Sequence, residues 1–137
     1  MNRSRNRSEP SPRPITFRAA EDLGAFELAQ LWADRTAWPI DERTPYDELS
    51  ELAVMSALGT WLQRWQPIAI HGAMLAGAKP EAVAGALGNS LEVAFERWRE
   101  WAMRQRDFVI DGKPAMSDKE YEAVARRFIA GIKRPVS

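Results

Sequence analysis

Charged side chains at helical spacing between residues 90 and 106 form the part of the sequence best suited to chemistry with a charged partner. At 100° per residue, the centre of the outward face falls on Glu96 and Glu100. Six residues face inward: Leu91, Ala94, Phe95, Trp98, Trp101 and Ala102. Four arginines flank the outward centre, two on each side: Arg97 and Arg104, and Arg99 and Arg106. The arginines can bind backbone phosphates, whereas the glutamates repel phosphate unless they accept from cytosine amino groups. The alternative is an ordinary solvated face, with Glu–Arg pairs worth a few tenths of a kcal/mol each.

A short helix precedes this segment and should position it. Lys79-Pro80-Glu81 opens the short helix and Gly88 closes it, because glycine suits the left-handed position after a helix end. Ser90 can cap a longer helix that runs to about Arg106. The sequence therefore predicts two helices joined by a very tight turn.

The small residues of this pair carry a family resemblance. Ala84 allows close contact between the helices, Gly88 lies in the turn, and Ala94 is buried between them. Three more residues complete the apolar set: Val83, Leu87 and Trp98. The spacing from Gly88 to Ser90, Ala94 and Trp98 resembles the helix-turn-helix superfamily, especially sigma-factor region-four-like domains and small actinobacterial regulators. The resemblance covers about a quarter of the chain.

The resemblance implies that the second helix enters the major groove of DNA. Transferred residue by residue, the family pattern places six positions at the interface: Ser90, Glu92, Val93, Glu96, Arg97 and Arg99. Arg104 adds a phosphate contact. The implied function is a small transcriptional regulator that binds double-stranded DNA. We expect a homodimer, because one short helix with so few basic groups binds a half-site weakly. The glutamates at the centre of the outward face depart from a typical DNA-reading helix.

Two further segments could contact DNA. Arg3, Arg5 and Arg7 lie in a basic arm, residues 1–14, whose Arg, Ser, Asn and Pro composition predicts disorder. Such arginines can enter a minor groove, although the arm taken alone is better explained as a solubilising tail or as an arm folded onto the acidic segment 21–51. The segment FVIDGKPAM, residues 108–116, contains an Asp-Gly hairpin signal that would place Lys113 at a wing tip. A plain connecting turn is the alternative.

The remaining periodicity predicts an all-α, compact bundle of about six helices in a single domain, residues 15–137. We expect one helix over residues 17–37 and a second from Thr44, its cap, with Val54, Leu58, Trp61, Leu62 and Trp65 on its core side. Pro67 should break the chain before a third helix that stops at Gly77. Ser117 and Glu120 form a capping box for the last helix.

Composition excludes several classes of function. The 137 residues carry 19 basic and 19 acidic side chains, so no global field draws the protein to phosphate or to a membrane. No stretch approaches the roughly 18 apolar residues of a membrane span, and the absence of cysteine fits a cytoplasmic protein. His71 lacks an acid or nucleophile placed by sequence, and no catalytic or metal-ligand motif is present. We expect no enzyme, no metal and no cofactor.

A different class of function fits the acidic first half. Residues 19–60 carry nine acids against two arginines, a net charge of −7. The acids at positions 41, 42, 47, 48 and 51 lack regular metal-ligand spacing and are better explained by helix capping and solvation. They could still contact a basic protein through the segment 21–51. The alternative function is therefore an interaction adaptor with a degenerate helix-turn-helix.

Overall fold

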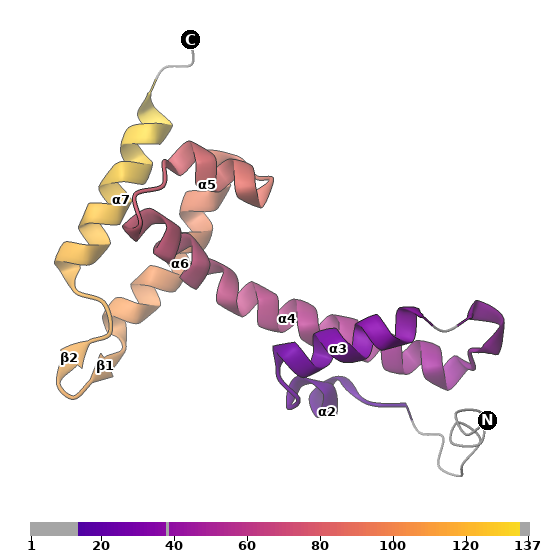
Figure 1. Ribbon diagram of the computed structural model, residues 1–137. Helices are drawn as coiled ribbons and strands as arrows, with labels where there is room; N and C mark the ends of the chain where they lie inside the picture. Colours follow the sequence, from indigo (N-terminus) through magenta and orange to yellow (C-terminus); the bar gives the residue numbers. More distant parts are fainter. Residues whose placement is uncertain (1–13, 38, 135–137) are drawn as a thin grey trace. The chain divides into compact units, whose positions relative to one another are not determined.

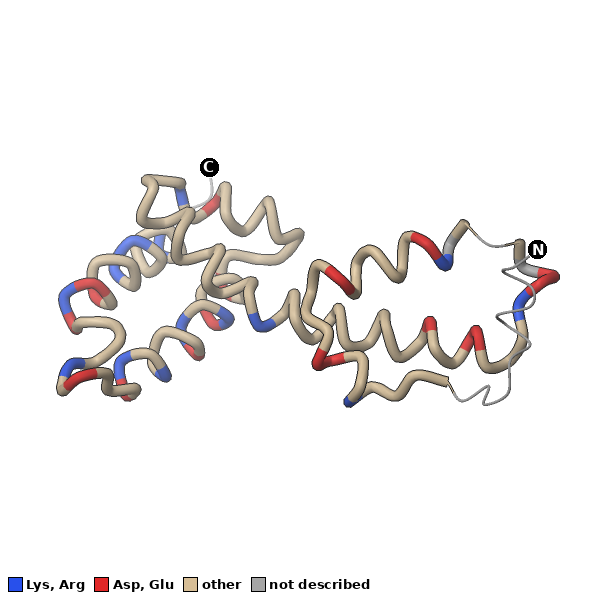
Figure 2. Tube along the Cα trace, turned by 60° about the horizontal axis from the view of Figure 1, so that its bottom comes forward, with Lys and Arg blue, Asp and Glu red and all other residues tan. Residues whose placement is uncertain are grey.

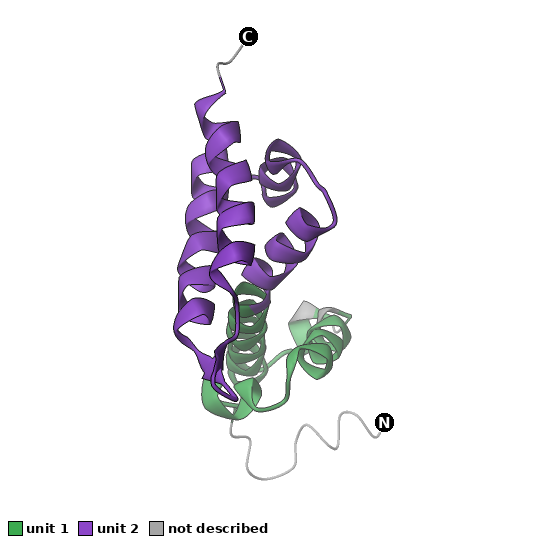
Figure 3. Ribbon diagram, turned by 90° about the vertical axis from the view of Figure 1, so that its left-hand side faces the viewer, with its two compact units in different colours: residues 1–64 green, residues 65–137 purple. Residues whose placement is uncertain are grey.

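The computed structural model describes residues 14–37 and 39–134. This part of the chain contains six α-helices, a 3₁₀ turn and one two-stranded antiparallel sheet (Figure 1). The predicted all-α class with a short hairpin is therefore confirmed. The chain divides into two compact units, residues 1–64 and residues 65–137, which are shown in different colours in Figure 3. The single domain over residues 15–137 stays a prediction.

The first unit packs two short helices against the start of a long one. Helix α2 is Phe17–Glu21, α3 is Ala25–Thr36, a 3₁₀ turn covers Ile40–Glu42, and α4, Pro45–Leu75, begins in this unit. The prediction of one helix over 17–37 is wrong, because Gly24 adopts a φ of 88°, which ends helical geometry between α2 and α3. Four fully buried residues form the core of the unit: Ala20, Leu28, Val54 and Ala57.

Helix α4 starts as predicted. The Thr44 hydroxyl accepts from the Asp47 N–H at 3.2 Å, and the Asp47 carboxylate accepts from the Thr44 N–H at 2.9 Å. These reciprocal bonds satisfy backbone donors that a helix start leaves unpaired. Thr44 is therefore confirmed as the cap.

The predicted break at Pro67 is wrong, because α4 continues through it to Leu75. Proline costs about 3 kcal/mol inside a helix, but Pro67 is itself buried, and Ile70 and Met74 beyond it belong to a hydrophobic core. The burial of Pro67 and the packing of the residues that follow it outweigh the lost hydrogen bond.

The core side predicted for α4 is only partly correct. Val54 is fully buried and Trp61 is half-buried, but Leu62 is 53% and Trp65 is 39% exposed. Leu62 therefore lies outside the core of the first unit.

The second unit is a helical cluster closed by a hairpin. After α4 come α5, Pro80–Leu87, α6, Leu91–Asp107, the strands β1, Val109–Ile110, and β2, Lys113–Pro114, and finally α7, Asp118–Lys133. Helices α6 and α7 lie side by side and are joined at one end by the hairpin (Figures 1 and 3). The core gathers residues from α4, α5, α6 and α7, and Trp98 and Phe128 are its largest fully buried side chains.

Local signals at the helix ends are confirmed. Gly88 has a φ of 71° after α5, and the Ser90 hydroxyl accepts from the Val93 N–H at 3.1 Å. Ser117 accepts in the same way from the Glu120 N–H at 3.1 Å, whereas the Glu120 carboxylate of the predicted capping box contacts His71. Asp111 and Gly112, with φ of 52° and 78°, form the turn of the predicted hairpin.

The end of α4 is held by a residue from the far end of the chain. Arg127 on α7 donates to the Met74 carbonyl at 2.6 Å and also donates to the Ala78 carbonyl. Carbonyls at a helix end have no intrahelical donor, so this guanidinium satisfies one of them.

In the part of the chain that the structure describes, no helix combines the length and apolar character needed to cross a membrane.

Candidate nucleic-acid interface

Close packing of α5 on α6 determines which face of α6 is buried and which face is exposed as the candidate interface. Ala84 on α5 is 5% exposed, and Ala94 and Trp98 on α6 are fully buried. The small side chains let the two helices approach, as their spacing predicts. The remaining predicted inward residues of α6 are buried or half-buried: Leu91, Phe95, Trp101 and Ala102. The predicted inward face of α6 is confirmed.

The opposite face of α6 carries the predicted interface residues. Ser90, Glu92, Val93 and Glu96 are all exposed, and Val93 is 44% exposed. Acidic and basic positions are interspersed along this helix, as they are elsewhere in the second unit (Figure 2). The Ser90 oxygen already accepts the capping bond, which leaves its hydroxyl proton for an outside acceptor. The early part of α6 therefore offers short polar and acidic groups and one apolar side chain.

Three of the four arginines on α6 have partners within the chain. Arg97 donates to the side-chain oxygen of Gln66 on α4, and Arg99 forms a 3.0 Å ion pair with Glu96. Both arginines are half-buried. The Arg99–Glu96 pair is an ordinary surface ion pair between positions three residues apart on one helix. For either arginine to bind a phosphate, the phosphate must replace these contacts.

Arg106 joins α6 to α7. Its Nε and Nη2 lie 2.9 and 2.7 Å from one oxygen of Asp118, and its guanidinium carbon lies 4.4 Å from the centre of the Tyr121 ring. The hydrogen bond to Asp118 raises the pKa of Arg106 above its ordinary value. Arg106 thus stabilises the hairpin end of the unit.

Arg104 and Lys113 are the cations best placed for an outside anion. Both are exposed, and neither forms a hydrogen bond or ion pair with another described residue. They belong to the same end of the unit, because the Met116 N–H after the hairpin donates to the Gln105 carbonyl at 3.2 Å. Lys113 pairs with Ile110 across the hairpin, directly beside its turn. Arg3, Arg5 and Arg7 lie outside the described residues.

A buried polar chain in the second unit could not be predicted from the sequence. The indole N–H of Trp98 donates to His71 Nδ1 at 3.0 Å, and His71 Nε2 lies 2.5 Å from a Glu120 oxygen. Since tryptophan only donates, Nδ1 is the acceptor, and Nε2 carries the proton shared with Glu120. These hydrogen bonds connect α4, α6 and α7, and His71 is only 8% exposed. No sequence signal links these residues, which lie 27 and 49 positions apart.

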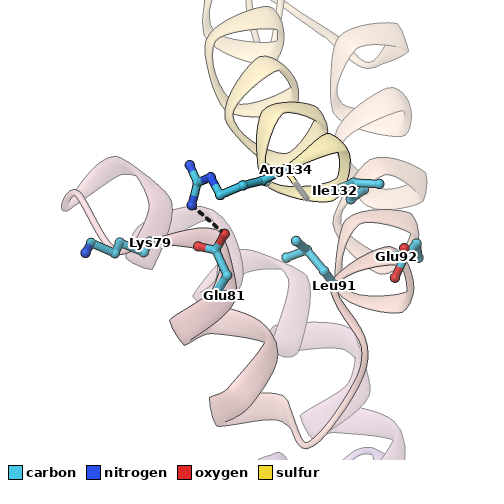
Figure 4. Close-up of a pocket in the computed structure, with 7 residues that line it drawn as sticks. Lys79, Glu81, Leu91, Glu92, Ile132 and Arg134 are labelled. Carbon is cyan, nitrogen blue, oxygen red and sulfur yellow. Dashed lines mark hydrogen bonds and ion pairs between the residues drawn. The ribbon is translucent and has the colours of Figure 1, made fainter. Parts of the chain in front are cut away.

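A hollow of about 570 Å³ lies beside the start of α6 (Figure 4). Its charged groups are of both signs, and Arg134 forms a 3.0 Å ion pair with Glu81. Gly131 allows α7 to pack closely here, because a Cβ at this position would lie 3.1 Å from a Leu91 methyl. Glu92 also lines the hollow. With its arginine paired, the hollow is poorly suited to a phosphate.

The acids of the first unit act largely within that unit. Asp47 caps α4, while Arg43 forms an ion pair with Glu48 at 3.3 Å and another with Glu51. Among the described residues, no three His, Asp or Glu side chains are grouped closely enough to hold a metal ion.

Comparisons with protein-family models, curated proteins and solved structures found no match. The structure itself defines an all-α protein in which a tightly joined helix pair exposes one charged face beside a short hairpin.

Proposed function

We propose that this protein is a transcriptional regulator of the helix-turn-helix type, which docks α6 in the major groove of duplex DNA. One observation carries the proposal. The residues that join α5 to α6 satisfy local backbone and packing needs, and they leave a face of α6 exposed from Ser90 to Arg104. A helix held by its inner face and exposed on its outer face can enter a groove about 12 Å wide.

Contacts to bases come from the early residues of α6 in this proposal. Ser90 can donate to a base acceptor, and Val93 can contact a thymine methyl group. Glu92 and Glu96 are acceptors, which suits cytosine amino groups and disfavours contacts with phosphate. The protein should therefore select its sequence partly through these carboxylates.

Contacts to phosphate come from the arginines and the hairpin. Arg104 and Lys113 need to break no internal ion pair, whereas Arg97 and Arg99 exchange Gln66 and Glu96 for phosphate oxygens. Lys113 occupies the place of a wing. The arginines at positions 3, 5 and 7 add contacts in the minor groove.

The adaptor alternative has weaker support. It needs Asp47, Glu48 and Glu51 to meet a basic partner, yet Asp47 caps α4 and the other two pair with Arg43. A partner would have to compete with these contacts. No observation on the described residues favours it over DNA.

The double variant Arg104→Ala plus Lys113→Ala should weaken binding to a genomic duplex pool by roughly 10-fold. It should also reduce the slope of log K against log salt by about 2, since each phosphate contact contributes about 0.9. Fluorescence anisotropy on labelled duplex measures both quantities. Circular dichroism should be unchanged, because both side chains are exposed.

The matched control is Arg18→Ala plus Lys133→Ala. It removes the same charge from exposed positions on α2 and in the last turn of α7. We expect the affinity of this variant to stay within about twofold of the original protein. Equal weakening by both pairs would point to attraction by net charge alone and would contradict docking through α6 and the hairpin.

A further inference from the structure

An uncharged apolar stripe runs along the exposed side of α4 in the first unit. Leu52 is 59%, Met55 is 46% and Leu62 is 53% exposed, and Gly59 lies between them on the same face. The spacing of three, four and three residues places all four positions within about 80° around the helix. No residue from 52 to 63 carries a charge. Exposed helix faces are normally polar, so this stripe needs an explanation.

The opposite side of the same segment is already used for folding. Val54 and Ala57 are fully buried in the core of the first unit, and the Trp61 indole N–H donates to the Glu21 carbonyl at 3.0 Å. The segment is therefore apolar on both sides, which is typical of a helix that is buried all round. The first unit covers only one of these sides.

We propose that the stripe binds the same stripe of a second copy of this chain, with the two α4 helices antiparallel. In an antiparallel pair with this spacing, Leu52 lies opposite Leu62 of the second copy, and Met55 lies opposite Gly59. The flexible methionine fills the space at Gly59, where an added Cβ would meet nothing within 4 Å. The two-fold axis repeats both pairs, so every large side chain of the stripe has a counterpart.

The chemistry of the stripe favours a second copy over a different partner. The stripe carries no charge with which to select a charged surface. Its spacing of three, four and three residues reads the same in both directions, so an antiparallel copy matches it. Two such faces together cover on the order of 1,000 Å², the lower limit for a specific interface. The dimer should accordingly be reversible, with a Kd on the order of micromolar. It forms without DNA and therefore does not depend on the proposed function.

Sedimentation velocity of the full chain without DNA tests the proposal. Between about 1 and about 100 µM, the mass should rise from 15.5 kDa toward twice that value. Leu62→Asp buries an unpaired carboxylate against Leu52 of the second copy and should raise the Kd at least about 100-fold. Tyr46→Asp is the control, because Tyr46 is 47% exposed on α4 within the same unit, about 160° around the helix from the centre of the stripe, and should leave the dimer intact.

A second readout does not depend on how Leu62→Asp folds. The chain contains no cysteine, so single-cysteine variants can be cross-linked cleanly. A mixture of Met55→Cys and Gly59→Cys should give a disulfide-linked dimer under mild oxidation, and a mixture of Met55→Cys and Tyr46→Cys should not. A monomer at every concentration, or equal cross-linking in both mixtures, would overturn the proposal.

Discussion

Replacing Trp98 with alanine should lower the free energy of unfolding of the second unit by about 4 kcal/mol. Trp98 is fully buried, and its ring lies 5.2 Å from Tyr121 and 5.7 Å from Phe128 between ring centres. Alanine removes these contacts and leaves a cavity among α4, α6 and α7. Urea denaturation followed by far-ultraviolet circular dichroism measures the change.

The variant Trp98→Phe distinguishes the contribution of ring packing from the contribution of the indole hydrogen bond. Phenylalanine keeps most of the aromatic contact but leaves His71 Nδ1, a buried acceptor, without its donor. We expect a loss of about 2 kcal/mol, between the original protein and the alanine variant. A loss below about 1 kcal/mol for Trp98→Ala would show that Trp98 does not support the core.

Leu28→Ala should lower the free energy of unfolding of the first unit by about 3 kcal/mol. Leu28 on α3 is fully buried beside Val54 and Ala57, and its loss opens a cavity in a small core. Phe26→Ala on the same helix is the control, because Phe26 is 84% exposed and should cost less than about 1 kcal/mol. Equal losses for the two variants would contradict the placement of this core.

The same denaturation curves test the predicted single domain over residues 15–137. If it holds, Leu28→Ala and Trp98→Ala each shift one common transition, because both cores unfold together. Two separate transitions, each shifted by only one variant, would show instead that the two units unfold independently.

Local chemistry explains which parts of the fold could be predicted. Helix ends could be predicted where one residue satisfies backbone groups only three or four positions away. This holds for Gly88, Ser90 and Ser117. The continuation of α4 through Pro67 could not be predicted, because it depends on the packing of Ile70 and Met74 against residues far along the chain. The separation of α2 from α3 at Gly24 was not predicted, because one residue with a positive φ does not change the spacing of apolar residues around it.

The sequence predicted which residues of α6 face outward, but it did not predict the contacts that these residues make. The 3.6-residue period of α6 identified Glu96 as outward and Trp98 as inward. It could not show that Arg97 reaches Gln66, since that contact depends on where α4 lies against α6. The link from His71 to Glu120 was hidden for the same reason.

The central claim is that α6 docks on duplex DNA, and the affinity of the full chain for a genomic duplex pool tests it most directly. Anisotropy titrations at several salt concentrations should give a linear fall of log K with log salt. Phosphate contacts by Arg97, Arg99, Arg104 and Lys113 should give a slope of roughly −4 per chain, and contacts by the arginines at positions 3, 5 and 7 should make it steeper. No binding at low salt, or binding that does not change with salt, would contradict the account.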